Sequence, residues 1–164
     1  MVLEEKNKNR EEDWRLRRSL LFVPGISPKM LNKALTLPAD CLIFDLEDAV
    51  APDKKEEARG IVRNFILNHR HDFRREIIVR VNHPSTPYFK DDILQIVEAA
   101  PECILLPKID SPEEVEESED ELEKAEQRWE VKAKTGLMLM IETVEGILNA
   151  VRIAKASKRV SALI

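Results

Sequence analysis

The chain has 164 residues, a formal net charge of −5 and 43% hydrophobic residues, as expected of a globular domain with a sizeable core. It has no apolar run near the roughly 18 residues that a membrane-spanning helix needs, and residues 1–15 are too charged for a secretory signal. Residues 113–126 hold nine acids and one lysine, a net charge of −8, so the remainder sums to +3. This balance excludes an extended nucleic-acid groove but permits a local pocket for a small anion.

The two cysteines, Cys41 and Cys103, both lie in apolar runs of strand length. This placement is typical of reduced core residues, so it favours a cytoplasmic protein without a disulfide. We expect residues 1–16 to be a charged extension and residues 17–164 to form one folded domain, because the apolar periodicity begins only after the charged segment.

Short apolar runs alternate with segments of helical period, which is the pattern of a parallel sheet wound with helices. We expect strands over residues 19–23, 41–46, 77–81, 103–106, 136–141 and 160–164. This alternation predicts an α/β fold, and we expect it to be of the TIM (β/α)8 barrel type. Such a barrel closes with eight strands, so the chain carries about the first five to six βα units. A strand over 160–164 would leave an edge that another chain could pair.

One helix is expected between each pair of strands, and two of the helix starts are clearly marked. Ser27 precedes Pro28, a pairing of N-cap residue and first helical position that favours helix initiation. Ser111 precedes Pro112, and Glu114 stands at the spacing of a capping box. The other helices are expected over about residues 53–68, 88–100 and 144–156.

Polar side chains follow the carboxyl ends of the expected strands, the edge at which barrels of this type carry their active sites. The first strand ends in Pro24-Gly25, and the later ends carry Glu47, Asp48, Arg80, Asn82, Lys108 and Glu142. Side chains alternate across a strand, so Asp45 shares a face with Glu47, and Arg80 shares one with Asn82. If these faces point inward, the carboxylates and the arginine converge.

Carboxylate oxygens suit Mg²⁺, which usually takes one or two protein carboxylates and fills its remaining positions with water and substrate. Zinc is not supported, because His69, His71 and His83 have no ligand spacing with the cysteines. The sequence therefore predicts a magnesium site at this edge.

Each candidate residue also has a structural alternative. The pair Glu47-Asp48 could close a turn, Arg80 could brace the barrel through an ion pair, and Lys108 could simply be solvated. Glu142, followed by Thr143, could mark no more than a helix start. The acidic segment 113–126 is most simply a solvated helix face.

Five blocks of the sequence resemble, in order, the signature blocks of the citrate lyase β-subunit family of the HpcH/HpaI aldolase superfamily. They are RRSLLFVPG, DCLIFDLEDAVAPDKKEEAR, VRVN, ILLPKID and LMLMIETVEGILNA. The likeness runs from about Arg17 to Ile164, and the DLEDAV-PxxK block is its most specific part. It implies the amino-terminal portion of a TIM-barrel lyase that is commonly oligomeric. Such enzymes use Mg²⁺ to cleave or form β-hydroxyacyl-CoA thioesters such as citryl-, malyl- or citramalyl-CoA.

The resemblance also implies roles for the residues at the strand ends. Glu142 matches the first metal ligand of the family, while Glu47 and Asp48 match an acidic pair that holds water on the metal and orients substrate. Arg80 matches the arginine that grips the keto-acid carboxylate and steadies the developing enolate. From its place at the same strand end, Asn82 is expected to be a further substrate contact.

Two further regions follow from the same likeness. Arg17 or Arg18, with the Pro24-Gly25 turn, matches the region associated with the acyl-CoA end of the substrate, and Lys108 matches a supporting lysine. In the family the sixth strand leads into a Gly-x-Glu-Asp block whose aspartate is the second metal ligand. This chain stops before that block, so we expect the second ligand to come from a complementing chain or a longer parent, and Mg²⁺ binding by the chain alone to be weak.

Two alternatives remain open at this point. A half-barrel without activity could serve as a binding or assembly protein that pairs its open edges with a partner. An aldolase acting on free hydroxy-keto acids would use similar residues without a thioester.

Overall fold

The computed structural model describes residues 16–70 and 75–164 of the chain. The predicted charged extension lies outside the described residues except for its last position, Leu16, and His71 lies outside them as well. The division at residue 17 therefore stays a prediction.

Six parallel strands form a single sheet in the order β1-β2-β3-β4-β5-β6, so each strand pairs with its neighbours in sequence. This sequential parallel order is that of a barrel wall and confirms the predicted fold class. The strands are β1 (Leu20–Pro24), β2 (Cys41–Asp45), β3 (Glu76–Arg80), β4 (Cys103–Leu106), β5 (Gly136–Leu139) and β6 (Val160–Leu163).

In the described part of the chain, five α-helices and one short 3₁₀ helix connect the strands. They are α1 (Pro28–Ala34), η1 (Pro52–Lys54), α2 (Lys55–His69), α3 (Phe89–Val97), α4 (Pro112–Arg128) and α5 (Val144–Ile153). Every predicted helix is present, and its bounds differ from the expected ones by a few residues. The second helix begins as a 3₁₀ turn at Pro52, a position where a missing backbone N–H costs no helical hydrogen bond.

The two marked helix starts are confirmed. The Ser27 side chain accepts a hydrogen bond from the Met30 backbone N–H, with Pro28 at the first helical position. Ser111 and Glu114 form a reciprocal capping box at the start of α4. These local bonds satisfy backbone donors that a helix leaves free, so the sequence specifies where both helices begin.

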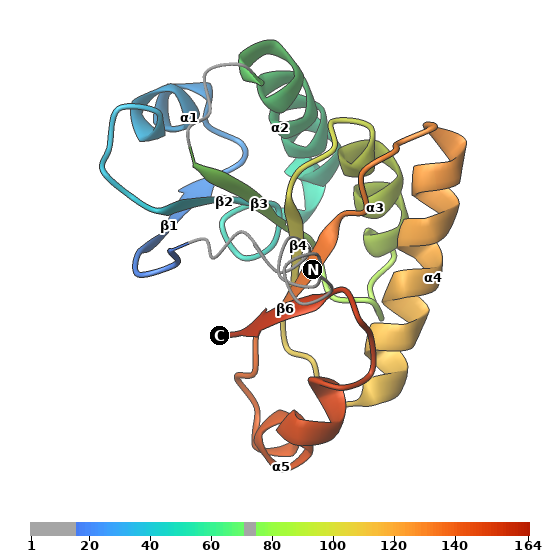
Figure 1. The fold of residues 1–164 in the computed structure, drawn as a ribbon. Helices are drawn as coiled ribbons and strands as arrows, with labels where there is room; N and C mark the ends of the chain where they lie inside the picture. Colours follow the sequence, from blue (N-terminus) through green and yellow to red (C-terminus); the bar gives the residue numbers. More distant parts are fainter. Residues whose placement is uncertain (1–15, 71–74) are drawn as a thin grey trace, which may run out of the picture.

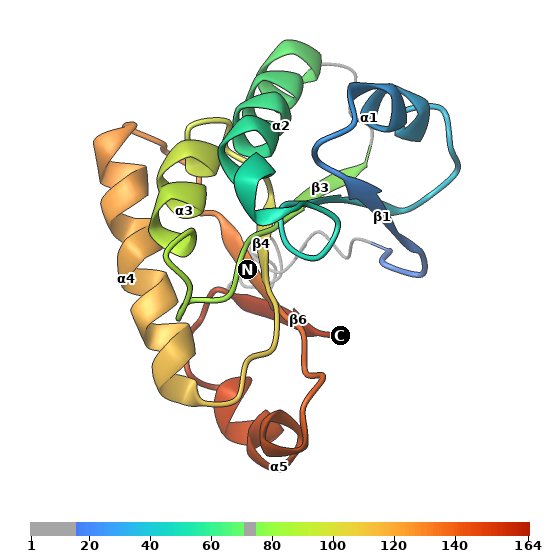
Figure 2. The ribbon, with the colours of Figure 1, turned by 180° about the vertical axis from the view of Figure 1, so that it is seen from behind.

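The two faces of the sheet differ in what covers them. Leu42 and Phe44 of β2, and Leu46 directly after it, belong to the larger apolar core on the helix side. Cys41 and Ile43 point the other way into a smaller cluster, which extends across the sheet through Ile78, Cys103, Leu105 and Met138. Figures 1 and 2 show that α1 to α4 lie along one side of the curved sheet, so the smaller cluster occupies its inner side. We call this the inner face.

The helix α5 carries an apolar stripe that no described residue covers. Val144, Ile147, Leu148 and Val151 recur at helical spacing and are 65–77% exposed. The opposite side of the helix is buried at Gly146 and Ile153 and lies beside α4. Within residues 16–70 and 75–164, no helix is both long and apolar enough to cross a membrane.

Candidate functional site

A buried ion pair on the inner face joins the last residues of β2 and β3. Asp45 and Arg80 are register partners in the parallel pairing of these strands. Arg80 Nε and Nη2 donate to the two Asp45 carboxylate oxygens at 2.8 and 2.7 Å. Both side chains are buried, with exposed fractions of 9% and 3%. Strand pleating puts both residues on the inner face. The pair therefore lies at the carboxyl edge of the sheet, at the bottom of the candidate site.

The same arginine also contacts both acids of the turn that follows β2. Arg80 Nη1 lies 3.0 Å from Glu47 Oε2 and 3.4 Å from Asp48 Oδ2. Its guanidinium carbon stands 5.0 Å from the ring centre of Phe22, which comes from β1. The structure therefore brings the predicted residues Arg80, Glu47 and Asp48 together, and adds Asp45, which the sequence only placed on the same face as Glu47.

Lys108, which follows β4, connects these acids to the end of β5. Its Nζ lies 2.7 Å from Glu47 Oε1 and 3.6 Å from Asp48 Oδ1. Its backbone N–H donates to Glu142 Oε1 at 3.1 Å. Lys108 therefore contacts all three acids that were predicted to surround the metal, and it is not merely a solvated lysine.

Glu142 itself is exposed, at the point where β5 leads into α5. The next residue, Thr143, caps α5 by accepting a hydrogen bond from the Gly146 backbone N–H, and its hydroxyl also bonds to Asp110. Since Thr143 performs the capping, the Glu142 carboxylate is left at the rim for another role. We refer below to Asp45, Glu47, Asp48, Arg80, Lys108 and Glu142 as the rim cluster.

The acids of the rim cluster raise the pKa values of its two cations, Arg80 and Lys108. Burial acts to lower the pKa of Arg80, but the hydrogen bond to Asp45 and the charges of Asp45, Glu47 and Asp48 outweigh it and raise that pKa. The hydrogen bond to Glu47 likewise raises the pKa of Lys108. Both cations consequently stay protonated at neutral pH.

A second set of polar groups supports the rim from the helix side of the sheet. Lys55 at the start of α2 is buried, and its Nζ donates to the carbonyls of Leu46 and Glu47, both at 2.7 Å. Burial lowers the pKa of this lysine, against the charges of nearby acids such as Asp92 and Asp45. These bonds hold the backbone of the turn that carries Glu47 and Asp48.

Asn82 belongs to this support and does not face the rim. Its side chain donates to Leu46 O at 3.1 Å and to Asp92 Oδ2 at 2.6 Å, and it is 3% exposed. Asp92 is fully buried and also accepts from Arg59 Nε at 2.8 Å. The expectation that Asn82 contacts substrate therefore finds no support in this geometry. The physical reason is that Asn82 lies beyond the end of β3, where the strict alternation of side chains no longer applies.

The Pro24-Gly25 turn fits tightly against the rim. The Gly25 backbone N–H donates to Asp45 O at 2.9 Å, and a Cβ at this position would lie 2.7 Å from the same oxygen. Only glycine allows the turn to approach β2 so closely, so the turn lies next to the residue that holds Arg80.

Arg17 and Arg18 lie at the opposite edge of the sheet, because they precede β1. Arg18 is largely exposed and pairs with Asp40, which precedes β2. Arg17 donates to both carboxylate oxygens of Glu76 at 2.6 Å and to Ser161 O at 3.2 Å. The structure does not bring Arg18 to the rim, so the expectation that it serves the acyl-CoA end is not supported by this placement.

The donor chemistry of the rim suits a hard cation, although the acids are spread out. No three acidic, histidine or cysteine side chains in the described part of the chain come together closely enough to hold a metal by themselves. Glu47 Oε2 is buried and accepts no hydrogen bond from any described residue, since its contact with Arg80 is poorly aligned. This buried oxygen, 3.0 Å from Arg80 Nη1 without an aligned hydrogen bond, and the exposed Glu142 carboxylate, which Lys108 links to Glu47, fit an ion that takes few protein ligands and several waters.

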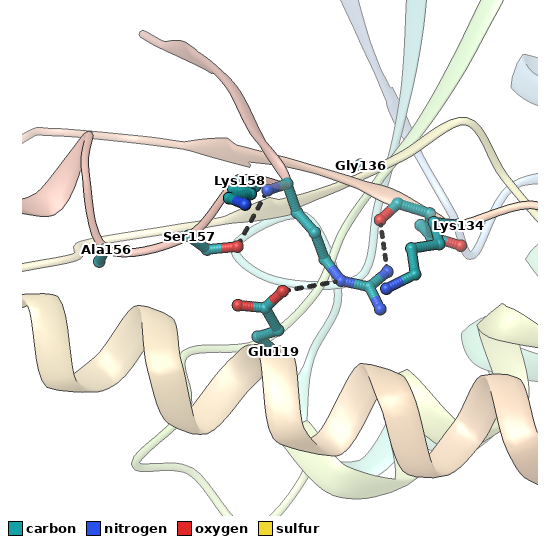
Figure 3. Close-up of a pocket in the computed structure, with 8 residues that line it drawn as sticks. Glu119, Lys134, Gly136, Ala156, Ser157 and Lys158 are labelled. Carbon is teal, nitrogen blue, oxygen red and sulfur yellow. Dashed lines mark hydrogen bonds and ion pairs between the residues drawn. The ribbon is translucent and has the colours of Figure 1, made fainter.

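A separate hollow of about 660 Å³ lies between α4 and the amino end of β6, away from the rim (Figure 3). The buried guanidinium of Arg159 at its edge pairs with Glu126 through two bonds, at 2.7 and 2.8 Å, and with Glu119 at 3.1 Å. These carboxylates already pair its charge, so the hollow provides no free cation from Arg159. Two acids of α4, Glu119 and Glu126, therefore pair with a buried arginine, so this side of the helix is not the solvated face that was expected.

Sequence reasoning missed three residues of this region: Asp45 as the main partner of Arg80, Lys55 and Asp92. For Lys55 and Asp92 a signal was available, because charged residues that recur on the apolar side of a predicted helix are expected to be buried and paired. Asp45 had been placed on one face with Glu47, but its pairing with Arg80 depends on the register of β2 against β3.

Comparison with protein families places residues 18–164 in the HpcH/HpaI aldolase/citrate lyase model. The citrate lyase subunit beta of Leuconostoc mesenteroides subsp. cremoris is 38% identical over 146 residues, which are 88% of this chain and 48% of that protein. A (3S)-malyl-CoA thioesterase of Cereibacter sphaeroides is 38% identical over 138 residues, covering 84% of this chain and 44% of that protein. The chain thus spans about half the length of the curated relatives it matches.

Solved structures agree with this placement. A citrate lyase beta subunit from M. tuberculosis, complexed with oxaloacetate and magnesium, superposes with a TM-score of 0.66 at 27% identity, over 90% of this chain and 58% of that chain. A citrate lyase from Burkholderia xenovorans LB400 reaches a TM-score of 0.78 at 24% identity, over 90% of this chain and 48% of that chain, and shows the shared fold.

Proposed function

The chain belongs to the HpcH/HpaI aldolase/citrate lyase family, and we propose from this membership that its rim cluster is part of a magnesium-dependent carbon–carbon lyase site. The proposed substrate is a β-hydroxyacyl-CoA thioester of the citryl-, malyl- or citramalyl-CoA type. The names of the relatives, citrate lyase subunit beta and (3S)-malyl-CoA thioesterase, support this substrate class. A related structure that contains oxaloacetate and magnesium supports a keto acid and Mg²⁺ as site components.

The observation that carries the proposal is the position of Arg80. Its guanidinium is buried at the carboxyl edge of the sheet, and Asp45 fixes its Nε and Nη2 through two hydrogen bonds. Nη1 makes only the longer or poorly aligned contacts with Glu47 and Asp48. A fixed cation with one partly used donor group at the mouth of a barrel is suited to a substrate carboxylate.

The residues of the rim cluster have different roles in the proposed site. Arg80 binds the carboxylate of the keto-acid part and stabilises negative charge as the carbon–carbon bond breaks. Glu142 would hold Mg²⁺, and Glu47 and Asp48 would orient the substrate beside it. When bound, Mg²⁺ would supply Lewis-acid polarisation of the keto and carboxylate oxygens. Asp45 keeps the guanidinium in place, and the backbone bonds from Lys55 hold the turn that carries Glu47.

A coupled lyase assay on malyl-, citramalyl- and citryl-CoA with Mg²⁺ tests the proposal. We expect Arg80→Ala and Glu142→Ala each to abolish any activity of the wild-type chain. Arg63→Ala is a matched control, because Arg63 pairs with Glu98 on the helix side of the sheet, away from the rim. Activity that persists in both rim variants would remove the proposed site.

A role in assembly is a second candidate, favoured by the exposed stripe of α5. In a TIM barrel each outer helix has helical neighbours on both sides, whereas α5 has α4 on one side and leaves Val144, Ile147, Leu148 and Val151 exposed. We propose that this stripe receives a further βα unit, either from a longer form of the chain or from a complementing chain. The pairing would complete the barrel around the rim cluster.

Co-expression with the carboxyl-terminal half of the Leuconostoc relative tests this second candidate. We expect the two polypeptides to co-purify and the double variant Ile147→Asp/Leu148→Asp to prevent it. Met30→Asp controls for an added charge, since Met30 is 52% exposed on a different helix. Co-purification that survives the double variant would exclude the stripe as the contact surface.

We also expect the protein to act in the cytoplasm. Both cysteines are free and buried, which is compatible with a reducing compartment. Fractionation of cells that express the native gene, with immunodetection of the chain, tests this expectation.

A further inference from the structure

The ammonium group of Lys108 occupies the space between acids that the proposed function assigns to metal and substrate. Nζ lies 2.7 Å from Glu47 Oε1 and 3.6 Å from Asp48 Oδ1. The backbone N–H of the same residue donates to Glu142 Oε1 at 3.1 Å. A single residue thus provides positive charge or hydrogen-bond donors to three carboxylates.

The backbone of Lys108 is held in an unusual conformation to achieve this. Its φ is +52°, in the left-handed region that residues with a Cβ rarely adopt. Such conformations persist where the surroundings require them and are found disproportionately at functional sites. Here the left-handed turn lets the N–H reach Glu142 while the side chain reaches Glu47 on another strand end.

The rim cluster needs such a cation because it holds more negative than positive charge. Asp45, Glu47, Asp48 and Glu142 contribute four carboxylates, against the cations of Arg80 and Lys108. Arg80 makes its two aligned hydrogen bonds to Asp45 and lies 3.0 Å from Glu47 Oε2, while Lys108 is the cation that pairs with Glu47 Oε1. Without it, like charges at the rim would repel one another.

Two further features would allow the ammonium of Lys108 to leave the carboxylates and return to them. Its side chain is 47% exposed, so the ammonium can leave the carboxylates for solvent without a buried charge being left behind. Glu47 Oε2, in contrast, is buried and lies 3.0 Å from Arg80 Nη1 without an aligned hydrogen bond from any described residue. The carboxylate held by Lys108 therefore retains capacity for a second ligand.

We propose that Lys108 is a tethered cation that holds the rim acids in place without a divalent ion and is displaced from Glu47 and Asp48 when Mg²⁺ binds. The inference rests on the proposed function, because it concerns the same acids. Its consequence is that Lys108 competes with Mg²⁺ and so sets the magnesium concentration at which the site fills.

Titration calorimetry of the full chain with MgCl₂ tests the proposal, with the melting temperature as a second readout. Lys108→Met removes the ammonium and keeps the backbone N–H that serves Glu142. We expect this variant to bind Mg²⁺ about twofold to fivefold more tightly than wild type, which corresponds to loss of one half-exposed competing ion pair. Its melting temperature without Mg²⁺ should be lower, and Mg²⁺ should raise it by more than in wild type.

Lys90→Met is the matched control, because Lys90 is 76% exposed and its ion pair, with Glu121 at 3.6 Å, involves no acid of the rim cluster. We expect its Mg²⁺ affinity to equal that of wild type. Lys108→Gly repeats the main test in a residue that adopts positive φ without strain, in case Lys108→Met folds poorly. An unchanged or weaker Mg²⁺ affinity in a folded Lys108 variant would overturn the proposal.

Glu142→Gln separates this inference from the proposed function. If Mg²⁺ binds to wild type and Lys108→Met alike and Glu142→Gln weakens both, the site stands and the competition is refuted. If Glu142→Gln leaves Mg²⁺ binding unchanged, or if neither wild type nor the Lys108 variants bind Mg²⁺, the proposed metal site itself fails. Binding by the Lys108 variants alone supports both.

Discussion

The guanidinium of Arg80 and the carboxylate of Asp45 form two parallel hydrogen bonds, at 2.8 and 2.7 Å, across the ends of two neighbouring strands. Asp45 also accepts the backbone N–H groups of Glu47 at 2.8 Å and Ala49 at 3.1 Å. One buried carboxylate therefore fixes both the arginine and the turn that carries the other acids. Stability and site geometry are coupled at this position.

Arg80→Met should destabilise the fold by about 3–5 kcal/mol, the typical result of leaving one member of a buried ion pair without its partner. The double variant Arg80→Met/Asp45→Asn should lose less than the single variant, because no buried charge remains uncompensated. Urea unfolding of both proteins measures the difference. A double variant as unstable as the sum of the single ones would show that the pair is not coupled.

Gly25→Ala should cost about 1–3 kcal/mol of unfolding free energy through overpacking. The added methyl would lie 2.7 Å from Asp45 O and 2.8 Å from a Val62 side-chain carbon. Gly60→Ala is the matched control, since no described atom lies within 4 Å of a Cβ there and the position is inside α2. It should stabilise the protein by up to about 1 kcal/mol through helix propensity. Equal changes in unfolding free energy for the two variants would contradict the close packing of the turn at Gly25.

Lys55→Met should destabilise the protein by about 1–3 kcal/mol, because two buried carbonyls, Leu46 O and Glu47 O, lose their donor. The neighbouring Lys54 is exposed and pairs with Glu57, so Lys54→Met should change stability by less than about 0.5 kcal/mol. Thermal unfolding of the two variants provides the comparison. A neutral Lys55→Met would mean that water replaces the ammonium at these carbonyls.

Stability should decline as pH falls below about 4.3, the ordinary pKa of glutamate. Burial acts to raise the pKa of Glu126, but hydrogen bonds from Arg159 and the Thr135 backbone outweigh it and lower that pKa. Arg17 does the same for Glu76. A carboxylate whose pKa is lowered by folding stabilises the protein above its unfolded pKa, and this contribution disappears as pH falls through the folded value.

Melting temperatures measured from pH 7 to pH 3 test this dependence. Glu126→Gln should be less stable than wild type at pH 7 and should lose less on acidification. Glu116→Gln, on the exposed side of the same helix, should follow the wild-type curve. Parallel curves for Glu126→Gln and wild type would rule out the Arg159 network as a source of the acid sensitivity.

The two thiols should be inert in the native protein. Burial raises the pKa of Cys41 and of Cys103 to about 12, with the nearby Glu76 carboxylate acting in the same direction. Because the thiolate is the reactive form, we expect negligible labelling by a disulfide reagent at pH 8 until the chain unfolds in urea. Rapid labelling of either cysteine in the folded protein would disprove this.

Local signals in the sequence predicted most of the fold. The capping residues Ser27 and Ser111 lie one residue before their helices and act through bonds to residues three positions away, so their effect is readable without tertiary information. Strand positions followed equally from short apolar runs. The alternation of strands and helices predicted a parallel sheet, and the sequential strand order is that of the barrel type that was expected.

The candidate site was predicted only in part. Glu47, Asp48, Arg80, Lys108 and Glu142 were found because each stands at a strand end, and parallel strands bring those ends to one edge. The expectation that Asn82 shares a face with Arg80 was wrong, and the substrate role of Arg18 stays a prediction. Asn82 turns into the support around Asp92, and Arg18 precedes its strand and lies at the far edge.

The sequence by itself determined which residues reach the carboxyl edge, because strand boundaries and side-chain alternation are local properties of the chain. Only the tertiary structure decided which charges pair there. Whether Arg80 binds Asp45 or Glu47, and whether Lys108 contacts solvent or acids, depends on register and distance between strands far apart in sequence. Electrostatic energy changes steeply with such distances and with burial, and neither is encoded in any short segment.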